Sequence, residues 1–261
     1  GVATMWPTVK LLDDVRCIKK KKYLVQNYEI DFYDFKDSNK IEANRSYSYP
    51  FDYVTISKWC KDWLKSEFNQ EAAWIYNGID IEQYRPHKRE FKDKIRILIE
   101  GDSSSAHKNV DEAFLVSNKL DSSKYEVWYM SYNAKPKDWY RVDKFLHRVP
   151  YEEVQKVYAD CDILLKTSLL ESFSYPPIEM MATGGYVVAL LNDGNKEYLE
   201  NEKNCLIYPN GDIDKAIHCI EIIVSDQALR DILYTNGINT AKSRDWNLIK
   251  DSILIEYVKE K

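Results

Sequence analysis

The pattern of apolar and polar positions changes near residue 95. Before this point, short apolar runs such as YVTI (53–56) alternate with polar segments, and SKWCKDWLKSEF (57–68) has the features of a helix that starts after the N-cap Ser57. From residue 95 onward, continuous apolar runs alternate with helical segments. Continuous apolar strands that alternate with helices are typical of a parallel sheet covered on both faces. The pattern therefore predicts an α/β fold built from βαβ units.

The predicted elements follow this alternation. Strands are expected at 23–27, 53–56, 95–101, 125–131, 143–149, 162–166, 186–191 and 204–209. Helices are expected at 7–16, 57–68, 108–119, 151–159, 177–184, 212–224, 226–240 and 246–260. The polar stretch IEQYRPHKREFKDK (81–94) is interpreted as a linker.

Composition narrows the class of protein. The net charge of −5 over 261 residues argues against a nucleic-acid binder, which usually has a strong basic excess. No apolar run approaches the length of a transmembrane helix, and GVATMWPTVK at the start lacks the layout of a signal peptide. The five cysteines include no CxxC pair, so neither a zinc site nor a disulfide framework is predicted, and a reducing cytoplasm fits best.

The lysine run KKKK (19–22) allows two interpretations. The simpler one is a solvated turn before the strand at 23–27. The alternative is a peripheral contact with anionic lipid headgroups, to which each lysine could contribute roughly 1 kcal/mol.

Two loops are expected to form a ligand site. In doubly wound sheets a ligand binds at the carboxyl edge, where the strand order reverses. If the strand at 95–101 opens this sheet, the reversal lies between it and the strand at 162–166, so the loops GDSSSAHKN (101–109) and TSLLESFSYPP (167–177) meet there. The first loop offers Gly101 and Lys108, which suit a phosphate, although it is neither a Walker A loop nor a dinucleotide fingerprint. The alternative is an exposed surface loop.

The second loop leads into a helix opened by prolines. Glu171 precedes this helix and Glu179 lies inside it, while Phe173, Ser174 and Tyr175 offer N–H donors at its start. The positive end of a helix favours anions, so two carboxylates here indicate a shared polar ligand.

The E-x7-E pattern in ESFSYPPIE, followed by a helix and the GGYVVAL strand, resembles the signature of retaining glycosyltransferases of family 4, which have the GT-B fold. TISKWCKDWL, the YNGID turn, the lysine of GDSSSAHKN and GNKEYLENEKNCLIYP follow in the family's order. YLVQNYEIDFY together with IEGDSSSAHKNVDEAF is similar to bacterial rhamnosyltransferases of the WsaF kind. The resemblance covers nearly the whole chain.

The resemblance implies an α/β fold of GT-B type, in which a Rossmann-like parallel-sheet domain binds the nucleotide-sugar beside a truncated N-terminal domain remnant. The implied domains are 1–85, the acceptor-side remnant plus linker; 86–245, the donor-binding domain; and 246–261, a C-terminal crossover helix. We therefore expect this chain to be the donor-binding half of a two-domain enzyme. A lack of activity in the isolated chain is compatible with this expectation.

The resemblance also implies residue roles. Glu179 would hold the ribose hydroxyls, and Glu171 would bind hydroxyls of the donor sugar and act as a catalytic residue together with Lys108, which would neutralise the diphosphate. The remaining implied donor-binding residues are Gly101, Asp102, Phe173, Ser174 and Tyr175 near the sugar and phosphates, and Arg148, Val149 and Tyr151 near the nucleobase.

Two positions depart from the family pattern. Asp102 stands where the family usually has an arginine that binds the diphosphate. Either another cation substitutes, with Arg45, Lys58 or a residue outside this sequence as candidates, or diphosphate binding is weaker. Ser174 stands where the family often has glycine, which restricts how closely the donor sugar can approach.

The function implied is transfer of a sugar, with rhamnose as one candidate, from a dTDP- or UDP-sugar with retention. The acceptor would be a glycan or a lipid-linked glycan in bacterial surface polysaccharide synthesis, in the cytoplasm or at the inner face of the membrane, with no metal or other cofactor. One alternative is a non-catalytic nucleotide-sugar binding half of a split glycosyltransferase, with a partner chain supplying the N-terminal domain. The other is a flavodoxin-like regulatory or scaffold domain without a sugar ligand.

Overall fold

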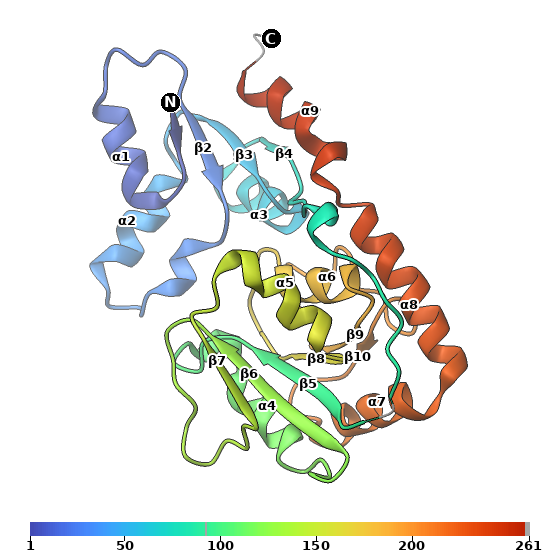
Figure 1. The fold of residues 1–261 in the computed structure, drawn as a ribbon. Coiled ribbons are helices and arrows are strands. Elements are labelled where there is room, and N and C mark those ends of the chain that lie inside the picture. The colour runs from blue at the N-terminus through green and yellow to red at the C-terminus, as the bar shows by residue number, and fades with distance from the viewer. Residues whose placement is uncertain (92, 259–261) are drawn as a thin grey trace. The chain divides into compact units, whose positions relative to one another are not determined.

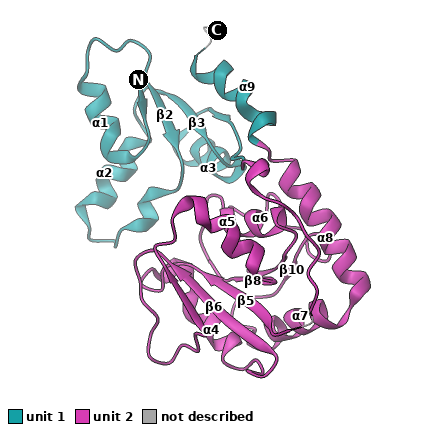
Figure 2. Ribbon diagram, viewed as in Figure 1, with its two compact units in different colours: residues 1–78, 246–261 teal, residues 79–245 magenta. Residues whose placement is uncertain are grey.

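The computed structural model describes residues 1–91 and 93–258, and the chain forms two compact units (Figure 2). Unit 1 contains Gly1–Gly78 and the segment that starts at Trp246. Unit 2 contains Ile79–Asp245. Within the described residues, each unit is built around its own parallel sheet (Figure 1).

The sheet of unit 1 has four parallel strands in the order β1-β2-β3-β4 among the residues described. The strands are β1 (Val2–Ala3), β2 (Lys22–Val25), β3 (Asp52–Thr55) and β4 (Ala72–Trp74). The helices are α1 (Trp6–Asp14), α2 (Ser38–Ser46), α3 (Lys58–Phe68) and α9 (Trp246–Tyr257), with a 3-10 helix, η1, at Glu29–Phe32. The predicted cap of α3 is confirmed, because Ser57 Oγ accepts a hydrogen bond from the Cys60 N–H at 3.1 Å.

Aromatic rings fill the core of unit 1. Tyr23 on β2 stacks on Tyr47 with 5.8 Å between ring centroids, and Trp63 on α3 meets Tyr47 edge-on at 4.9 Å. All three side chains are buried. Because each such ring buries about 150–250 Å² of surface, a few of them give a short-stranded sheet a substantial core.

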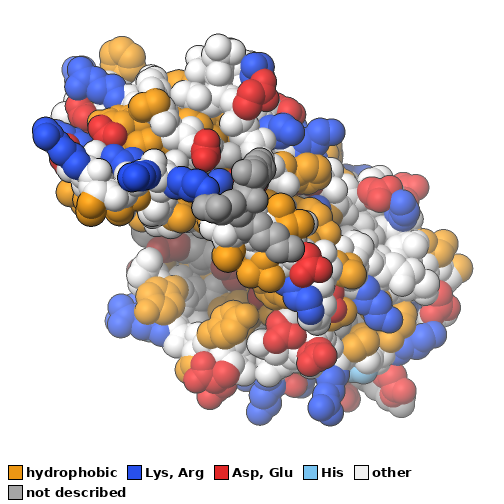
Figure 3. Space-filling view, turned by 90° about the horizontal axis from the view of Figure 1, so that it is seen from above, with side chains coloured by type: hydrophobic (Ala, Val, Ile, Leu, Met, Phe, Trp, Pro, Cys, Tyr) orange, Lys and Arg blue, Asp and Glu red, His pale blue; other side chains and the backbone are white. Residues whose placement is uncertain are grey.

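The lysine run leads into β2, and its last residue, Lys22, is the first residue of that strand. Lys21 Nζ is 3.5 Å from a carboxylate oxygen of Asp13, and Lys22 Nζ is 2.7 Å from Glu256 Oε1 on α9. Basic and acidic side chains are also mixed on the face drawn in Figure 3. Lys21 and Lys22 thus have carboxylate partners within unit 1, and Lys22 belongs to the strand rather than to the predicted turn before it.

The sheet of unit 2 has six parallel strands in the order β10-β9-β8-β5-β6-β7 among the residues described. The strands are β5 (Ile95–Glu100), β6 (Tyr125–Ser131), β7 (Lys144–His147), β8 (Ile163–Lys166), β9 (Tyr186–Ala189) and β10 (Leu206–Ile207). The helices are α4 (Val110–Ser117), α5 (Tyr151–Asp160), α6 (Tyr175–Ala182), α7 (Ile213–Ser225) and α8 (Gln227–Lys242), with 3-10 helices η2 (Ile81–Gln83) and η3 (Ala106–Lys108). The α/β fold class predicted from the alternation is confirmed.

The strand order reverses between β5 and β8. From β5 the chain adds β6 and β7 on one side, and it then returns to place β8, β9 and β10 on the other side of β5. The loops that leave β5 and β8 therefore meet at the carboxyl edge, as the sequence predicts.

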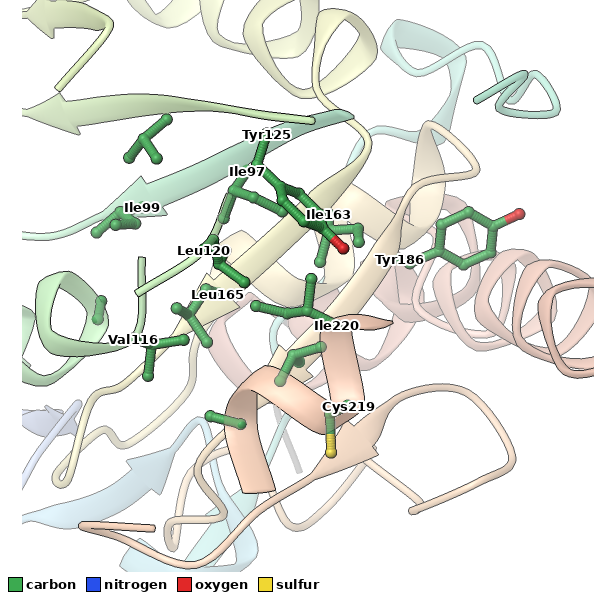
Figure 4. Packing of buried hydrophobic residues seen from close by; sticks show 14 of the residues in the cluster. Ile97, Ile99, Val116, Leu120, Tyr125, Ile163, Leu165, Tyr186, Cys219 and Ile220 are labelled. Carbon is green, nitrogen blue, oxygen red and sulfur yellow. The ribbon is translucent and has the colours of Figure 1, made fainter. Parts of the chain in front are cut away.

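The core of unit 2 lies on both faces of this sheet. Ile97 and Ile99 of β5 and Leu165 of β8 point towards α7, where Ile220 and Cys219 complete the cluster (Figure 4). Side chains alternate between faces along a strand, so the equally buried Leu98 and Leu164 lie on the opposite face, where α6 packs on β8. Because both faces are covered, the central strands β8 and β9 are buried along their whole length, which explains their nearly continuous apolar runs, whereas the edge strand β7 has exposed ends.

The boundary between the units lies earlier than the predicted one at residues 85 and 86. The Ile79 N–H donates to the carbonyl oxygen of Arg244 at 2.8 Å, and Tyr84 donates to Glu179 at 2.8 Å. Residues 79–85 are thus part of unit 2. The sequence pattern does not indicate that residues 79–85 pack on unit 2. These contacts include hydrogen bonds, which leave no periodic apolar pattern in the sequence.

No helix in the described ranges is long and apolar enough to cross a membrane. Cys161, Cys205 and Cys219 are buried free thiols.

Candidate functional site

The loop after β5 is a compact turn. Gly101 is buried with a φ of +146°, a value that side-chain-bearing residues rarely adopt, and a Cβ there would lie 3.1 Å from Val110. Asp102 Oδ1 accepts hydrogen bonds from the Ser104 N–H at 3.0 Å and the Ser104 hydroxyl at 2.7 Å. Burial raises the pKa of Asp102, but these hydrogen bonds outweigh it and lower the pKa. Asp102 therefore shapes the loop, and the loop then places Lys108 at the end of η3.

Lys108 and Glu171 meet across the two loops. Lys108 Nζ lies 2.8 Å from Glu171 Oε1, and the two side chains are 26% and 12% exposed. Burial raises the pKa of Glu171, but Lys166 and Lys108 together lower it, so this carboxylate is ionised. The sequence places these two residues in one predicted site, and the structure brings them into direct contact.

The turn after β9 supports the loop that carries Glu171. The side-chain amide of Asn192 donates to the carbonyl oxygen of Ser168 at 2.9 Å, and the carboxamide oxygen of Asn192 accepts the Gly194 N–H at 3.1 Å. A Cβ at Gly194 would lie 2.6 Å from the carbonyl carbon of Glu171. The absence of a side chain at Gly194 thus allows two backbones to approach closely and holds Glu171 in place.

Helix α6 begins beside Glu171. Ser174 is its N-cap and is buried, with a hydroxyl oxygen that has no hydrogen-bond partner among the described residues. The Tyr198 hydroxyl donates to the carbonyl oxygen of Ser174, and the Phe173 ring packs edge-on against Tyr175 at 4.9 Å. The Arg244 guanidinium lies 5.2 Å from the Phe173 ring centroid, and this cation–π contact supports the loop that carries Phe173. Pro176 and Pro177 in the first turn of α6 have no N–H, so the backbone donors that this helix start can offer to an anion are those of Phe173, Ser174 and Tyr175.

Glu179 lies at the end of a cavity of about 280 Å³ in unit 2. The carboxylate is 9% exposed and accepts a hydrogen bond from Tyr84 at 2.8 Å. Burial raises the pKa of Glu179, although the hydroxyls of Tyr84 and Tyr158 favour its ionised form. The cavity is lined by Glu100, Met130, Ser131, Tyr132, Val149, Val154, Tyr158, Tyr175, Pro176 and Glu179.

The three residues predicted near a nucleobase separate in the structure. Val149 lines this cavity, but Arg148 and Tyr151 do not. Arg148 has a φ of +55°, is exposed, and places its guanidinium 5.5 Å from the Tyr132 ring centroid. Tyr151 is 68% exposed at the start of α5. The positive φ at Arg148 is the reason, because it turns this side chain outward while Val149 points inward.

Sequence reasoning missed two charged residues of the site. Lys166 ends β8 and Glu100 ends β5, and their side chains meet with Lys166 Nζ 2.5 Å from Glu100 Oε2. Lys166 Nζ is also 3.6 Å from Glu171 Oε1. A charged residue closing an apolar strand at the carboxyl edge is the signal that could have found both. Arg45 and Lys58, the cations proposed to substitute for the family arginine, belong to unit 1 instead.

Among residues 1–91 and 93–258, no three His, Cys, Asp or Glu side chains gather in an arrangement that could hold a metal ion.

The comparisons with known proteins agree with this architecture. The model of the family "Glycosyl transferases group 1" matches residues 142–240, which include Glu171 and Glu179. The O-antigen biosynthesis protein RfbC of Myxococcus xanthus is 24% identical over 265 residues, covering 97% of this chain and 20% of the relative. The O-antigen chain mannosyltransferase RfbU of Salmonella typhimurium is 27% identical over 148 residues, covering 52% of this chain and 40% of the relative. The chain thus spans well under half the length of either relative.

The fold has a clear counterpart among solved structures. Anabaena HepE, solved in complex with UDP-glucose, superposes with a TM-score of 0.81 at 16% identity, covering 98% of this chain and 78% of that chain. The chain therefore has the α/β fold with parallel sheets of GT-B glycosyltransferases, and the matches in sequence support the glycosyl transferases group 1 family.

Proposed function

We propose that this chain carries the donor site of a retaining glycosyltransferase. It transfers a sugar from a dTDP- or UDP-sugar to a glycan or lipid-linked acceptor in surface polysaccharide synthesis. The observation that carries the proposal is the convergence of Lys108, Glu171 and Glu179 at the carboxyl edge of β5 and β8. A cation for phosphate, a carboxylate for sugar hydroxyls and a buried carboxylate for ribose are the groups that a nucleotide-sugar requires.

The cavity beside Glu179 suits the nucleoside. Its apolar lining from Met130, Val149 and Val154 can cover a base, and Glu179 at its end can accept a ribose hydroxyl. Deoxyribose retains a 3′-hydroxyl, so both dTDP and UDP satisfy this arrangement. The diphosphate then extends towards Lys108 and the N–H groups of Phe173, Ser174 and Tyr175 at the start of α6.

The chemistry follows from where charge develops. When the anomeric bond breaks, its electron pair passes to an oxygen of the diphosphate, and Lys108 and the α6 N-terminus stabilise that charge. The acceptor hydroxyl attacks from the same face and gives its proton to the leaving oxygen, so the configuration is retained without a protein nucleophile. Glu171 holds the donor sugar by its hydroxyls during this step, which is an orienting role.

The relatives support the same setting. Both have names that place them in O-antigen synthesis, and one is named a mannosyltransferase. A hexose donor is consistent with both, and rhamnose is the sugar that the family resemblance favours. The proposed location is the cytoplasm, with the inner face of the membrane as the alternative if the acceptor is lipid-linked. We expect no metal in the reaction.

Isothermal titration calorimetry of the 261-residue chain with UDP, dTDP, GDP and ADP tests the proposal. We expect one pyrimidine nucleotide to bind, and Glu179→Ala and Lys108→Ala each to weaken it by about 10- to 100-fold, as for loss of a hydrogen bond to a charged group. Lys119→Ala is the matched control, since Lys119 is an exposed lysine of unit 2 paired with the exposed Asp214.

The outcomes are distinct. Binding that falls in both site variants and not in Lys119→Ala supports the donor site and names the base. Absence of binding by all four nucleotides, from a chain with a cooperative thermal unfolding transition, would overturn it. Equal losses in the two lysine variants, with no loss in Glu179→Ala, would point to unspecific charge attraction instead.

A further inference from the structure

Lys166 is a buried cation between two carboxylates. Its side chain is 1% exposed, and its ammonium group lies 2.5 Å from Glu100 Oε2 and 3.6 Å from Glu171 Oε1. It also donates to the carbonyl oxygen of Glu100 at 3.3 Å. A lysine is almost never fully buried unless it is paired, so its place at the end of β8 depends on these partners.

Glu171 is shared between two lysines that differ in freedom. Lys108 and Lys166 approach the same oxygen, Oε1, but the Lys108 side chain is 26% exposed and extends from the loop after β5. Lys166 extends from a strand in the middle of the sheet and is held by a second carboxylate. Lys108 can therefore move towards a ligand, whereas Lys166 cannot.

This difference matters once a diphosphate arrives. Lys108 can reach the phosphates only by leaving Glu171, and a largely buried carboxylate that loses its cation carries a large desolvation penalty. If Lys108 were the only partner, Glu171 would oppose donor binding. Lys166 removes this opposition because it stays beside Glu171.

We propose that Lys166 is a positioning residue that keeps Glu171 ionised and in place when Lys108 transfers to the donor diphosphate. This inference rests on the proposed function, since it requires a diphosphate ligand at Lys108. The proposal also names a cation that compensates for the missing family arginine, whose position Asp102 occupies. Lys166 does so indirectly, because it frees Lys108 to bind the diphosphate.

Several charged or titratable groups face Glu171 besides these lysines. They are His107 beside Lys108, Glu100 on β5 and Tyr198 after β9. Burial and Lys108 lower the pKa of His107, so it is neutral near pH 7. Glu100 loses its lysine partner whenever Lys166 is substituted, but it does so in both Glu171 backgrounds, so a comparison between these backgrounds cancels this contribution together with those of His107 and Tyr198.

A double-mutant cycle on UDP binding tests the proposal, with dTDP in its place if that is the nucleotide the chain binds. The chains are the unsubstituted protein, Lys166→Met, Glu171→Gln and the double variant, measured by calorimetry. We expect Lys166→Met to weaken binding roughly tenfold, because Lys108 is then retained by Glu171. In the Glu171→Gln background the same substitution should cost less than about twofold, because no carboxylate competes for Lys108.

The pH dependence gives a second signature. In Lys166→Met, Glu171 has one cation instead of two and takes up a proton at a higher pH, which releases Lys108. The roughly tenfold loss relative to the unsubstituted chain should therefore shrink as the pH is lowered. A cavity or packing defect would produce a loss that is the same at every pH.

Lys166→Gln keeps the proposal testable if Lys166→Met does not fold. It keeps a hydrogen-bond donor beside Glu100 and Glu171 but no charge, so UDP affinity should fall roughly tenfold, as in Lys166→Met. Unchanged affinity in a folded Lys166→Gln chain would overturn the inference, as would equal Lys166→Met losses in both Glu171 backgrounds. These results would leave the proposed function intact, whereas no nucleotide binding by the unsubstituted chain would overturn both.

Discussion

The hydroxyl of Tyr84 donates a hydrogen bond of 2.8 Å to the carboxylate of Glu179, a residue 95 positions away in the chain. Tyr84 is 7% exposed and Glu179 is 9% exposed, so the bond is sheltered from water. It ties the segment before β5 to the cavity proposed for the nucleoside. The segment is therefore part of the wall that holds Glu179, rather than a passive linker.

Replacing Tyr84 by Phe removes this bond and leaves the ring in place. A hydrogen bond to a charged group contributes about 1.5–3 kcal/mol, and the free energy of unfolding should fall by that amount. Urea unfolding followed by circular dichroism measures it. Tyr151→Phe, at an exposed hydroxyl, is the control and should leave stability unchanged; a Tyr84→Phe variant as stable as this control would show that the bond contributes nothing.

The strands and loops of unit 2 were predictable because local signals agree there. A continuous apolar run such as IRILIE and the proline-opened helix after Glu171 each specify an element on their own. Parallel order then brings the loops after β5 and β8 together, so contact between Lys108 and Glu171 follows from topology. The structure shows this contact at 2.8 Å, and the ligand role of the two residues stays a prediction.

The remaining partners depend on register and on backbone dihedrals, which the sequence does not show directly. The 2.5 Å contact between Lys166 and Glu100 requires knowing that both strands end at the same level. Arg148 and Val149 differ in whether they line the cavity because of one positive φ. Tyr84 lies in a polar stretch with no periodic pattern, so nothing local indicates its distant partner.

Arg89 is a second anchor of the segment before β5. Its guanidinium donates to the carbonyl oxygens of Cys161, Tyr158 and Thr183, each at 3.0 Å, and the side chain is buried. Arg89→Met removes one buried hydrogen bond to each of these three oxygens and should lower the free energy of unfolding by about 3 kcal/mol, although Thr183 still accepts from the His87 N–H and Tyr158 from the Thr183 hydroxyl.

Chemical denaturation of both Arg89→Met and a neighbouring control measures the effect. Lys88 pairs at 3.2 Å with Asp231, and the side chains are 68% and 51% exposed, so Lys88→Met should leave stability essentially unchanged. Similar losses in the two variants would mean that Arg89 acts only through general charge.

Gly194 should be intolerant of a side chain. A Cβ there would lie 2.6 Å from the carbonyl carbon of Glu171, and backbone cannot yield as a flexible side chain can. We expect Gly194→Ala to lower the free energy of unfolding by about 2 kcal/mol through overpacking, and to weaken nucleotide-sugar binding because the loop that carries Glu171 moves.

Gly211→Ala is the control that separates the effect of the steric clash at Gly194 from the effect of backbone strain alone. Gly211 has a φ of +81°, and a Cβ at this position would meet no atom of the described residues within 4 Å. Alanine there should cost about 1 kcal/mol and leave UDP-glucose binding unchanged. Thermal unfolding and calorimetry with UDP-glucose provide both readouts. Unchanged binding in a folded Gly194→Ala chain would contradict the role given to this close approach.

The two glutamates of the E-x7-E pattern should respond to pH in opposite ways. Burial raises the pKa of Glu179 above its value of 4.5 in an unfolded chain. The carboxyl group of Glu179 therefore holds its proton more tightly in the folded state than in the unfolded state. Stability from this group is present below the unfolded pKa and is lost as the pH rises through the folded pKa. Glu179→Gln, which stays neutral, should therefore gain stability relative to the unsubstituted chain as the pH rises from about 4 to about 7.

Glu171→Gln is the matched comparison of opposite sign. Although burial raises the pKa of Glu171, Lys166 and Lys108 outweigh it and lower the pKa below the unfolded value of 4.5. Its stability is present above the unfolded pKa and is lost as the pH falls through the folded pKa, so Glu171→Gln should lose stability relative to the unsubstituted chain as the pH rises. Urea unfolding of the three chains at several pH values measures both trends. Parallel trends in the two variants would contradict the distinct environments of these carboxylates, and a flat difference for Glu179→Gln would show that its burial is relieved in solution.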